Sequence, residues 1–252
     1  MLEINKIHLG DSYKLIKQIP DKSIDCIYTD VPYLIDGGGQ GNSALGKRLF
    51  KRNQSLKDSN IYNGFDYKTF INESMRVLKK LNLFIWLSKL QFIEILNEVY
   101  SYNNGNFTFD LLTWNKLNPT PGTNNTWLPD IEYCIHFREK GVKLNDGYEL
   151  KSKWFTSPIN KHDKDLYDHL TIKPLELVKR HLEHATQPND LVLDCFSGSG
   201  TTCVAAKELG RRFIGIEIDP EYHKISVDRL NGITSSGQTS IFTDFDMEDG
   251  KI

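Results

Sequence analysis

The segment Asp30-Val31-Pro32-Tyr33 brings together a carboxylate, a constrained backbone carbonyl and an aromatic ring. Pro32 fixes its own φ near about −65° and favours an extended conformation at Val31, so the Val31 carbonyl has a set direction. An amine attached to a flat base carries N–H donors that Asp30 and this carbonyl can accept, while Tyr33 can stack on the ring. The segment therefore predicts a pocket for the exocyclic amine of a base.

A second turn, Phe196-Ser-Gly-Ser-Gly200, follows an apolar run and precedes a small-residue helix that begins at Thr201. Its glycines let the backbone pass close to a ligand, and the helix behind directs free N–H groups at that ligand. Glu217 lies about 20 residues further on, where a nucleoside-binding fold places a carboxylate for ribose hydroxyls. Cys203 breaks the dinucleotide fingerprint, and no lysine completes a phosphate loop. The turn predicts a nucleoside site.

Apolar runs alternate with amphipathic segments and predict the elements that position these turns. Strands are expected at residues 4–9, 24–29, 83–87, 107–114, 130–137, 191–194 and 212–219. Residues 130–137 alternate in polarity, which indicates an antiparallel strand near the sheet edge. The pattern predicts a doubly wound α/β sheet of six or seven strands, mostly parallel. Ligands bind outside the carboxyl ends of such strands, so both turns are expected to face one crevice.

Four motifs occur in order along the chain: Asp30–Tyr33, His169–Glu176, Asp194–Gly200 and Gly215–Asp219. They resemble the D/N/S-P-P-Y catalytic motif, the H-x-T-x-K-P-L segment, the F-x-G-x-G cofactor motif and the ribose-binding acid motif of the amino-group DNA methyltransferases. A catalytic motif before the cofactor motif is the order of the β group of this family, which uses S-adenosylmethionine. The resemblance implies a Rossmann-like sheet and direct methyl transfer without a covalent enzyme intermediate.

The resemblance also implies a role for individual residues. The pocket for a flipped base would consist of Asp30, Val31, Pro32 and Tyr33. The cofactor would be bound by Asp11, Asp30, Lys173, Pro174, Asp194, Phe196, Gly198, Gly200, Thr201 and Glu217. Val31 stands where the family usually has proline; since this residue acts through its carbonyl, we expect activity to survive with a less rigid loop.

An aspartate at position 30, rather than serine, resembles the adenine-N6 members more than the cytosine-N4 members. The leading hypothesis is therefore an adenine-N6 methyltransferase acting on double-stranded DNA. Three alternatives stay open: a cytosine-N4 methyltransferase, a non-catalytic DNA-binding or regulatory descendant of the fold, and a small-molecule or RNA methyltransferase. Members of the family often form homodimers, and a cognate restriction endonuclease can act on the same site. A homodimer and such an endonuclease are therefore possible partners.

A single catalytic domain is expected over residues 1–231, followed by an acidic flexible tail at 232–252. A glycine-rich basic loop at 36–65 carries the expected phosphate-binding residues, with a solvated flexible loop as the alternative. These residues are Lys47, Arg48, Lys51 and Arg52. Residues 139–171 are polar, are expected to be irregular and form the predicted target-recognition region, with Trp154 and Phe155 as a small satellite core.

The composition is that of an ordinary globular chain of 252 residues with a net charge of −2, so an anionic partner must meet local basic patches. No apolar run is long enough to span a membrane, and the first residues do not resemble a signal peptide. The four cysteines show no disulfide spacing, which indicates a reducing cytoplasm. No metal site is expected, and His162, His169, His181 and His184 are expected at the surface or at helix caps.

Overall fold

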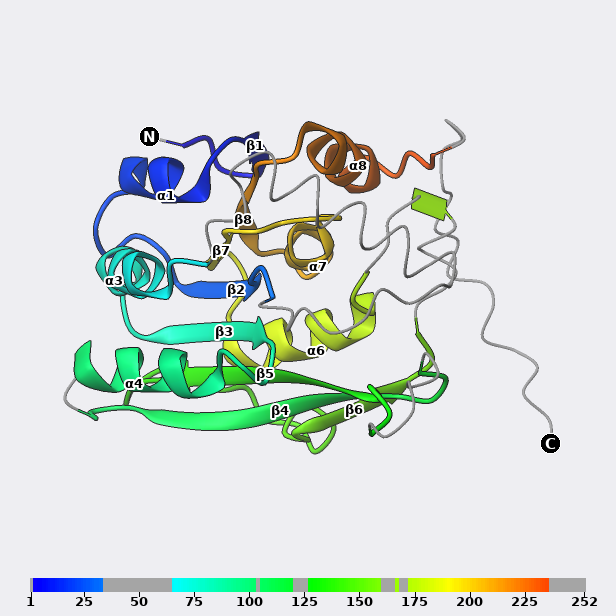
Figure 1. Ribbon diagram of the computed structural model, residues 1–252. Coiled ribbons are helices and arrows are strands. Elements are labelled where there is room, and N and C mark those ends of the chain that lie inside the picture. Colours follow the sequence, from blue (N-terminus) through cyan, green and yellow to red (C-terminus); the bar gives the residue numbers. More distant parts are fainter. Residues whose placement is uncertain are drawn as a thin grey trace.

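The computed structural model describes residues 2–33, 65–102, 105–119, 127–159, 166–167 and 172–235. These residues form an eight-stranded sheet with helices on both faces (Figure 1). The strands are β1 (Lys6–Leu9), β2 (Cys26–Asp30), β3 (Asn82–Leu87), β4 (Thr108–Lys116), β5 (Ile131–Arg138), β6 (Trp154–Ser157), β7 (Leu191–Asp194) and β8 (Arg212–Glu217). The predicted α/β class is confirmed.

The strand order is β1-β8-β7-β2-β3-β5-β4-β6. Parallel pairing joins the strands from β1 to β3, and β4 is parallel to β6. Strand β5 is antiparallel to both of its neighbours, β3 and β4. One reversed strand near the edge of a mostly parallel sheet is what the alternating pattern predicted. Because β5 runs in the opposite direction, its first residues lie beside the carboxyl ends of the parallel strands.

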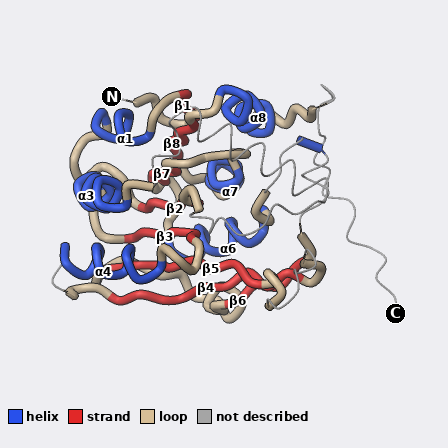
Figure 2. The backbone as a smooth tube through the Cα atoms, viewed as in Figure 1, coloured by secondary structure: helices blue, strands red, loops and turns tan. Residues whose placement is uncertain are grey.

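Two layers of helices cover the sheet, one on each face (Figure 2). The first layer contains α1 (Ser12–Leu15), the 3-10 helix η1 (Ile16–Gln18), α3 (Tyr67–Val77) and α4 (Phe92–Tyr102). The second contains α6 (Leu175–Ala185), α7 (Thr201–Glu208) and α8 (Pro220–Leu230). Successive strand residues point to opposite faces, so Ile27 joins the first core and Tyr28 the second. This double burial explains why β2 and β3 are almost continuously apolar.

Three of the helices have an aspartate as their N-cap residue. The side chains of Asp11, Asp66 and Asp219 accept hydrogen bonds from N–H groups in the first turns of α1, α3 and α8. Such caps satisfy backbone donors that have no partner within the helix. Because Asp11 follows β1 and Asp219 follows β8, these caps fix where two chain segments leave the carboxyl edge of the sheet.

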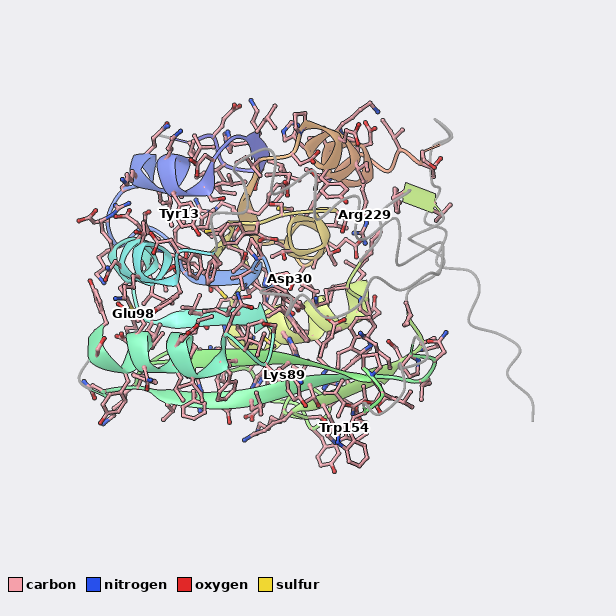
Figure 3. All side chains as sticks on the ribbon, in the orientation of Figure 1. Tyr13, Asp30, Lys89, Glu98, Trp154 and Arg229 are labelled. Atoms are coloured by element: carbon pink, nitrogen blue, oxygen red, sulfur yellow. The ribbon has the colours of Figure 1, made fainter. Side chains whose placement is uncertain are left out.

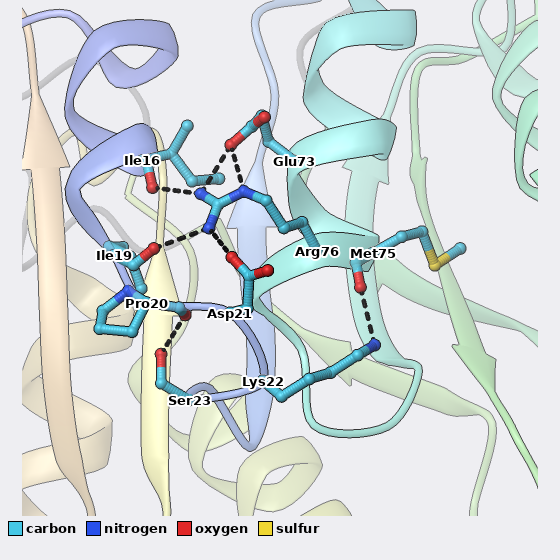
Figure 4. Close-up of polar contacts among 9 residues, drawn as sticks. All are labelled: Ile16, Ile19, Pro20, Asp21, Lys22, Ser23, Glu73, Met75 and Arg76. Atoms are coloured by element: carbon cyan, nitrogen blue, oxygen red, sulfur yellow. Dashed lines mark hydrogen bonds and ion pairs between the residues drawn. The ribbon is translucent and has the colours of Figure 1, made fainter.

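Helix α3 is fastened to the end of η1 by a group that we call the Arg76 cluster: Arg76, Glu73, Asp21 and the carbonyls of Ile16 and Ile19 (Figure 4). Arg76 Nη1 donates to the Ile19 carbonyl at 2.8 Å and to Asp21 at 2.6 Å. Its Nη2 donates to the Ile16 carbonyl at 2.9 Å and to Glu73 at 2.7 Å, and Nε donates to Glu73 at 2.9 Å. The whole guanidinium fork is therefore paired.

The structure corrects the expectation that residues 139–171 are irregular. Residues 154–157 form β6, which pairs in parallel with β4, so the sheet has one strand more than the highest expected number. Trp154 is 60% exposed and is not part of a satellite core, whereas Phe155 packs against the second core. The strand has only four residues of mixed polarity, so it carries no clear strand pattern. Its pairing with β4 is also non-local and cannot be read from the local sequence.

Several predictions fall on other parts of the chain. The predicted DNA-binding residues Lys47, Arg48, Lys51 and Arg52 lie outside the described residues. The bounds of the catalytic domain, the recognition region and the tail stay predictions. Among the helices that the structure describes, none is long and apolar enough to cross a membrane.

Candidate active site

The carboxyl ends of adjacent strands bring the predicted motifs to one edge of the sheet. Asp11 lies two residues after the end of β1, Glu217 ends β8, Asp194 ends β7 and Asp30 ends β2. Figure 3 labels Asp30 at the end of β2, in the middle of the sheet. The two turns, distant in sequence, therefore share one edge because β2 and β7 are hydrogen-bonded neighbours.

Asp30 is held on one side only. Its Oδ2 accepts a hydrogen bond from Lys173 Nζ at 2.6 Å, while its Oδ1 is buried and has no hydrogen-bond partner among the residues that the structure describes. Lys173 Nζ also lies 3.4 Å from the Tyr33 hydroxyl and 5.6 Å from the centre of its ring. Burial raises the pKa of the Asp30 carboxyl, and the Lys173 ammonium opposes that rise. Within the described part of the chain, Oδ1 is therefore a buried acceptor without a donor, and its carboxyl group shares Lys173 with the hydroxyl and ring of Tyr33.

Four side chains form what we call the Lys173 cluster: Asp30, Lys173, Glu132 and Lys116. Glu132 binds Lys173 through Oε2 at 2.9 Å and Lys116 through Oε1 at 2.6 Å. Burial acts to raise the pKa of Glu132, but the two lysines together lower it to about 2. Burial alone would lower the pKa of Lys173, yet Asp30 and Glu132 hold it well above its usual range. Glu132 and Lys173 are therefore charged at neutral pH.

A buried polar chain lies beneath this cluster. Lys173 Nζ sits 5.0 Å from the centre of the Trp86 ring, and Trp86 Nε1 donates to the Tyr28 hydroxyl at 2.9 Å. That hydroxyl lies 3.1 Å from His181 Nδ1. The expectation of a surface or capping role for His181 is wrong: it is buried, and burial lowers its pKa to about 3. A neutral imidazole therefore supports the floor of the site.

The backbone around Asp30 is fixed by hydrogen bonds. The Val31 N–H donates to the Trp86 carbonyl at 3.2 Å, and Gln91 Nε2 donates to the Pro32 carbonyl at 2.9 Å. Gln91 is itself held by Ser88 through its Oε1. A proline at position 31 would lack the N–H that extends the pairing of β2 with β3. At position 31, a backbone hydrogen bond from valine therefore restrains the chain where a proline ring would otherwise do so.

The glycine turn and Glu217 are directly joined. The Gly198 N–H donates to Glu217 Oε2 at 2.6 Å, and the Asp219 N–H donates to Oε1 at 2.9 Å. Gly198 and Gly200 have φ values of 50° and 77°, in the left-handed region that favours glycine. Burial raises the pKa of Glu217, and the backbone donors oppose this rise. The two backbone donors therefore fix the orientation of the Glu217 carboxylate beside the glycine turn.

Asp194 links the two motifs. Its Oδ1 accepts hydrogen bonds from Thr29 Oγ1 at 2.8 Å and from the Phe196 N–H at 3.2 Å. Thr29 directly precedes Asp30, so Asp194 connects the glycine turn to the end of β2. Burial raises the pKa of Asp194 to about 6.

The remaining predicted cofactor residues lie at the same edge in different surroundings. Phe196 packs against the rings of Tyr13, Phe65 and Phe70, with centroid distances of 6.3, 5.8 and 5.8 Å. Asp11 caps α1. Pro174 precedes α6, and Lys173 beside it contacts Asp30.

Thr201 begins α7, and its hydroxyl accepts from buried Arg229 at 2.7 Å. Arg229 also lies 3.3 Å from the Ser199 carbonyl and so ties α8 to the turn.

This edge fits S-adenosylmethionine by the chemistry of its donors and acceptors. Each oxygen of Glu217 accepts one backbone N–H and retains a lone pair for a ribose hydroxyl. Helix α7 begins at Gly200 without a side-chain cap, so N–H groups of its first turn are available at the same place. Asp30 supplies a carboxylate beside the glycine turn. Among the described residues, no group of His, Cys, Asp and Glu side chains could hold a metal ion.

Sequence reasoning missed Glu132 and Lys116. The signal was present: an antiparallel strand that begins at residue 131 must begin at the edge where its parallel neighbours end. Lys116 is the last residue of β4, at that same edge. The pairing of the two residues with Lys173 required the strand order, which the sequence did not predict.

The fold and the paired turns define an S-adenosylmethionine-dependent amino-group methyltransferase. A family model described as DNA methylase, covering N6 and N4 methyltransferases, matches residues 24–228. The chain belongs to this N6/N4 DNA methylase family. It is 33% identical over 240 residues to the type II methyltransferase M2.LlaDCHI of Lactococcus lactis subsp. cremoris, covering 88% of this chain and 87% of that protein.

Solved structures share the fold. A crystal structure of M1.HpyAVI in complex with SAM superposes with a TM-score of 0.65 at 24% identity, covering 89% of this chain and 98% of that one. The PvuII DNA methyltransferase, described as cytosine-N4-specific, superposes with a TM-score of 0.65 at 18% identity, covering 89% and 85%. The resemblance to this family is confirmed, and S-adenosylmethionine is the cofactor.

Proposed function

We propose that the chain methylates the exocyclic N6 amine of adenine in double-stranded DNA, on a base turned out of the helix. The observation that carries the proposal is the buried Asp30 Oδ1, which has no hydrogen-bond donor among the described residues, while Lys173 links its carboxylate to Tyr33. An adenine amine offers the missing donor, and the ring of Tyr33 offers a stacking surface. An aspartate at position 30 favours adenine over cytosine by its resemblance to the adenine-N6 members.

The chain's own residues would orient rather than attack. S-adenosylmethionine, when bound, supplies a methyl group on a positively charged sulfur. Glu217 would accept the ribose hydroxyls, and the turn from Phe196 to Gly200 would lie against the nucleoside. Asp30 Oδ1 and the Val31 carbonyl would accept the two amine hydrogens, which favours a pyramidal nitrogen with its lone pair directed at the methyl group. Orientation of this kind contributes several kcal/mol to lowering a barrier.

The remaining predictions of partners follow from the same proposal. The basic residues Lys47, Arg48, Lys51 and Arg52 would bind DNA phosphates, which contribute affinity and little sequence information. A restriction endonuclease acting on the same sequence, a homodimer and a cytoplasmic location stay expectations. The type II methyltransferase name of the Lactococcus relative supports the first of these.

Cytosine-N4 methylation is the second candidate, favoured by one observation. The PvuII enzyme, described as cytosine-N4-specific, has the same fold. The same pair of acceptors could receive the amine of cytosine, since both bases present an amine on a flat ring. The size of the base and the residue at position 30 separate the two candidates.

The test uses the full chain, unmethylated genomic DNA and cofactor carrying an isotopic methyl label. After digestion to deoxynucleosides, mass spectrometry should find the label in N6-methyl-2′-deoxyadenosine and none in N4-methyl-2′-deoxycytidine. The reverse distribution would establish the second candidate. Asp30→Ala should lower turnover by about 10²–10⁴-fold while leaving cofactor affinity largely unchanged, because Oδ1 serves the base. Turnover near wild type in this variant would refute the catalytic assignment.

A further inference from the structure

Glu132 lies between two lysines, and the three residues belong to three different parts of the fold. It stands near the start of β5, Lys116 ends β4, and Lys173 precedes α6. Each oxygen of Glu132 binds one lysine, Oε2 with Lys173 at 2.9 Å and Oε1 with Lys116 at 2.6 Å. The three side chains are 21%, 15% and 11% exposed. Long side chains this well covered are held in one arrangement by their partners.

Lys173 has two carboxylate partners but uses only one oxygen of Asp30. Its Nζ contacts Asp30 Oδ2 and Glu132 Oε2, while Asp30 Oδ1 accepts from no donor on the described residues. The rings of Trp86 and Tyr33 lie beside the ammonium, 5.0 and 5.6 Å from it. Rings can attract an ammonium but cannot replace a carboxylate as a hydrogen-bond acceptor. Glu132 is therefore the second carboxylate that accepts from Lys173, and the Tyr33 hydroxyl accepts from the same ammonium at the longer distance of 3.4 Å.

The charges of the Lys173 cluster cancel. Two carboxylates face two ammonium groups, so the cluster is neutral when Asp30 is ionised. Removal of Glu132 would leave a net positive charge beside Asp30, and removal of Lys116 would leave a net negative one. Buried charges at this spacing interact strongly because little water screens them.

We propose that Glu132 and Lys116 are positioning residues for catalysis, which hold Lys173 on Asp30 Oδ2 and keep Oδ1 free and ionised for the amine. This inference rests on the proposed role of Asp30. In the transfer, the amine nitrogen gives its electron pair to the methyl carbon and the carbon–sulfur bond breaks with its pair left on sulfur. One N–H proton then passes to Asp30 Oδ1, which must be ionised to accept it.

Other titratable groups surround the cluster and bear on its pH response. They are Tyr33, Tyr28, Cys134 and Asp194. Burial raises the pKa of Tyr28, Tyr33 and Cys134 well above the usual range, so all three stay neutral near neutral pH. Asp194, whose pKa burial raises to about 6, contributes equally to the wild type and to every variant below.

The experiment measures the pH profile of single-turnover methyl transfer for wild type, Glu132→Gln, Lys116→Met and the double variant. The acidic limb reports the protonation of Asp30. Removal of the Glu132 charge should move this limb to lower pH by about one unit, and removal of the Lys116 charge should move it to higher pH by about half a unit. The double variant, in which the Asp30–Lys173 pair is again neutral, should return to within about 0.3 units of wild type.

Rate constants on the plateau provide a second readout. Glu132→Gln should lower the plateau by about tenfold because Lys173 becomes free to cover Oδ1, and Glu132→Asp should recover part of this loss. Lys79→Met is the matched control: it removes a half-exposed lysine that pairs with Asp25 at 2.8 Å, away from the predicted recognition region. It should change neither the limb nor the plateau. If Glu132→Gln does not fold, Lys116→Met alone tests the direction of the shift.

Outcomes separate this inference from the proposed function. Limbs that coincide in all variants, with altered thermal stability alone, would show that Glu132 and Lys116 are structural and would overturn the inference. Asp30→Ala in the same assay tests the proposed function. If this variant is inactive while the limbs of the other variants coincide, the proposed function stands and only the inference fails. An active Asp30→Ala variant would remove the basis of both.

Discussion

The Arg76 cluster and the Lys173 cluster each contain a cation that lies between two carboxylates, and they differ in which polar atoms have no partner among the described residues. In the Arg76 cluster the guanidinium donates to two carboxylates and two backbone carbonyls. In the Lys173 cluster one carboxylate oxygen, Asp30 Oδ1, is buried and receives no hydrogen bond from the part of the chain that the structure describes. A buried acceptor without a partner costs about 1–3 kcal/mol.

The difference indicates which cluster serves the fold and which serves a ligand. A complete set of hydrogen bonds joins α3 to η1 and needs nothing further. An incomplete set lowers stability until a donor arrives, so the missing bond becomes available to a substrate. Under the proposed function, the energetic cost at Asp30 would be offset when the amine of the base donates to Oδ1.

The largest effect is expected from Lys173→Met. This change leaves Asp30 and Glu132 near each other without their shared cation, so one of them takes up a proton. Because breaking a buried ion pair costs several kcal/mol and Asp30 is 39% exposed, we expect a loss of about 3 kcal/mol in the free energy of unfolding. Turnover should fall by about 10³-fold as Asp30 loses its position and charge. Urea unfolding and single-turnover transfer measure the two effects.

Lys179→Met is the matched control for that variant. Lys179 lies in α6 and pairs with Glu176 and Glu208 at 3.2 Å near the surface. Its removal should cost less than about 1 kcal/mol and leave turnover unchanged. Equal effects of the two substitutions would erase the distinction drawn between the clusters.

Arg76→Met should produce the opposite division of effects. The variant loses every hydrogen bond of the Arg76 cluster and leaves the Ile16 and Ile19 carbonyls without this donor, so unfolding should become easier by about 2–3 kcal/mol. Turnover should stay within about twofold of wild type at a temperature where the variant is folded, because the cluster lies away from the carboxyl edge. Lys79→Met, which removes a half-exposed pair with Asp25 from the loop after α3, is the control and should cost less than about 1 kcal/mol. A large loss of turnover in Arg76→Met would show that α3 transmits its position to the site.

The sequence predicted the parts of the site that depend on local order. Turn residues such as Gly198 and Pro32 identify themselves because backbone conformation restricts which residue types fit. The carboxyl ends of parallel strands meet at one edge, so Asp30 and Glu217 could be placed together before any contact was known. The reversed direction of β5 was readable from its alternation.

What the sequence could not predict depends on non-local pairing. The contact between Glu132 and Lys173 requires β5 to lie beside β3 and α6 to begin above both, and no local pattern encodes that order. His181 reads as an ordinary polar residue on α6 until Tyr28 is placed opposite it. Strand β6 was missed because four residues of mixed polarity carry too little periodicity.

The smallest effect concerns Asp194, which combines features of both clusters: its Oδ1 is fully paired, yet its charge is buried. Burial raises its pKa to about 6 from an ordinary value near 3.8, so the folded state binds a proton more tightly than the unfolded state. The stability from this proton is present below about pH 4 and is lost as pH rises through about 6. Asp194→Asn cannot ionise, and its Oδ1 can still accept from Thr29 and Phe196.

The asparagine variant should therefore match wild type near pH 4 and become more stable by about 1–2 kcal/mol above pH 6, with the difference growing between these values. Urea unfolding at a series of pH values measures this difference, and Asp190→Asn, a half-exposed carboxylate before the same strand, is the control with a smaller slope. A difference that is constant with pH would show that Asp194 is already neutral or equally charged in both states. A gain that grows with pH would mean that the chain keeps a destabilising charge at the joint between its two motifs, as it keeps an unpaired oxygen at Asp30.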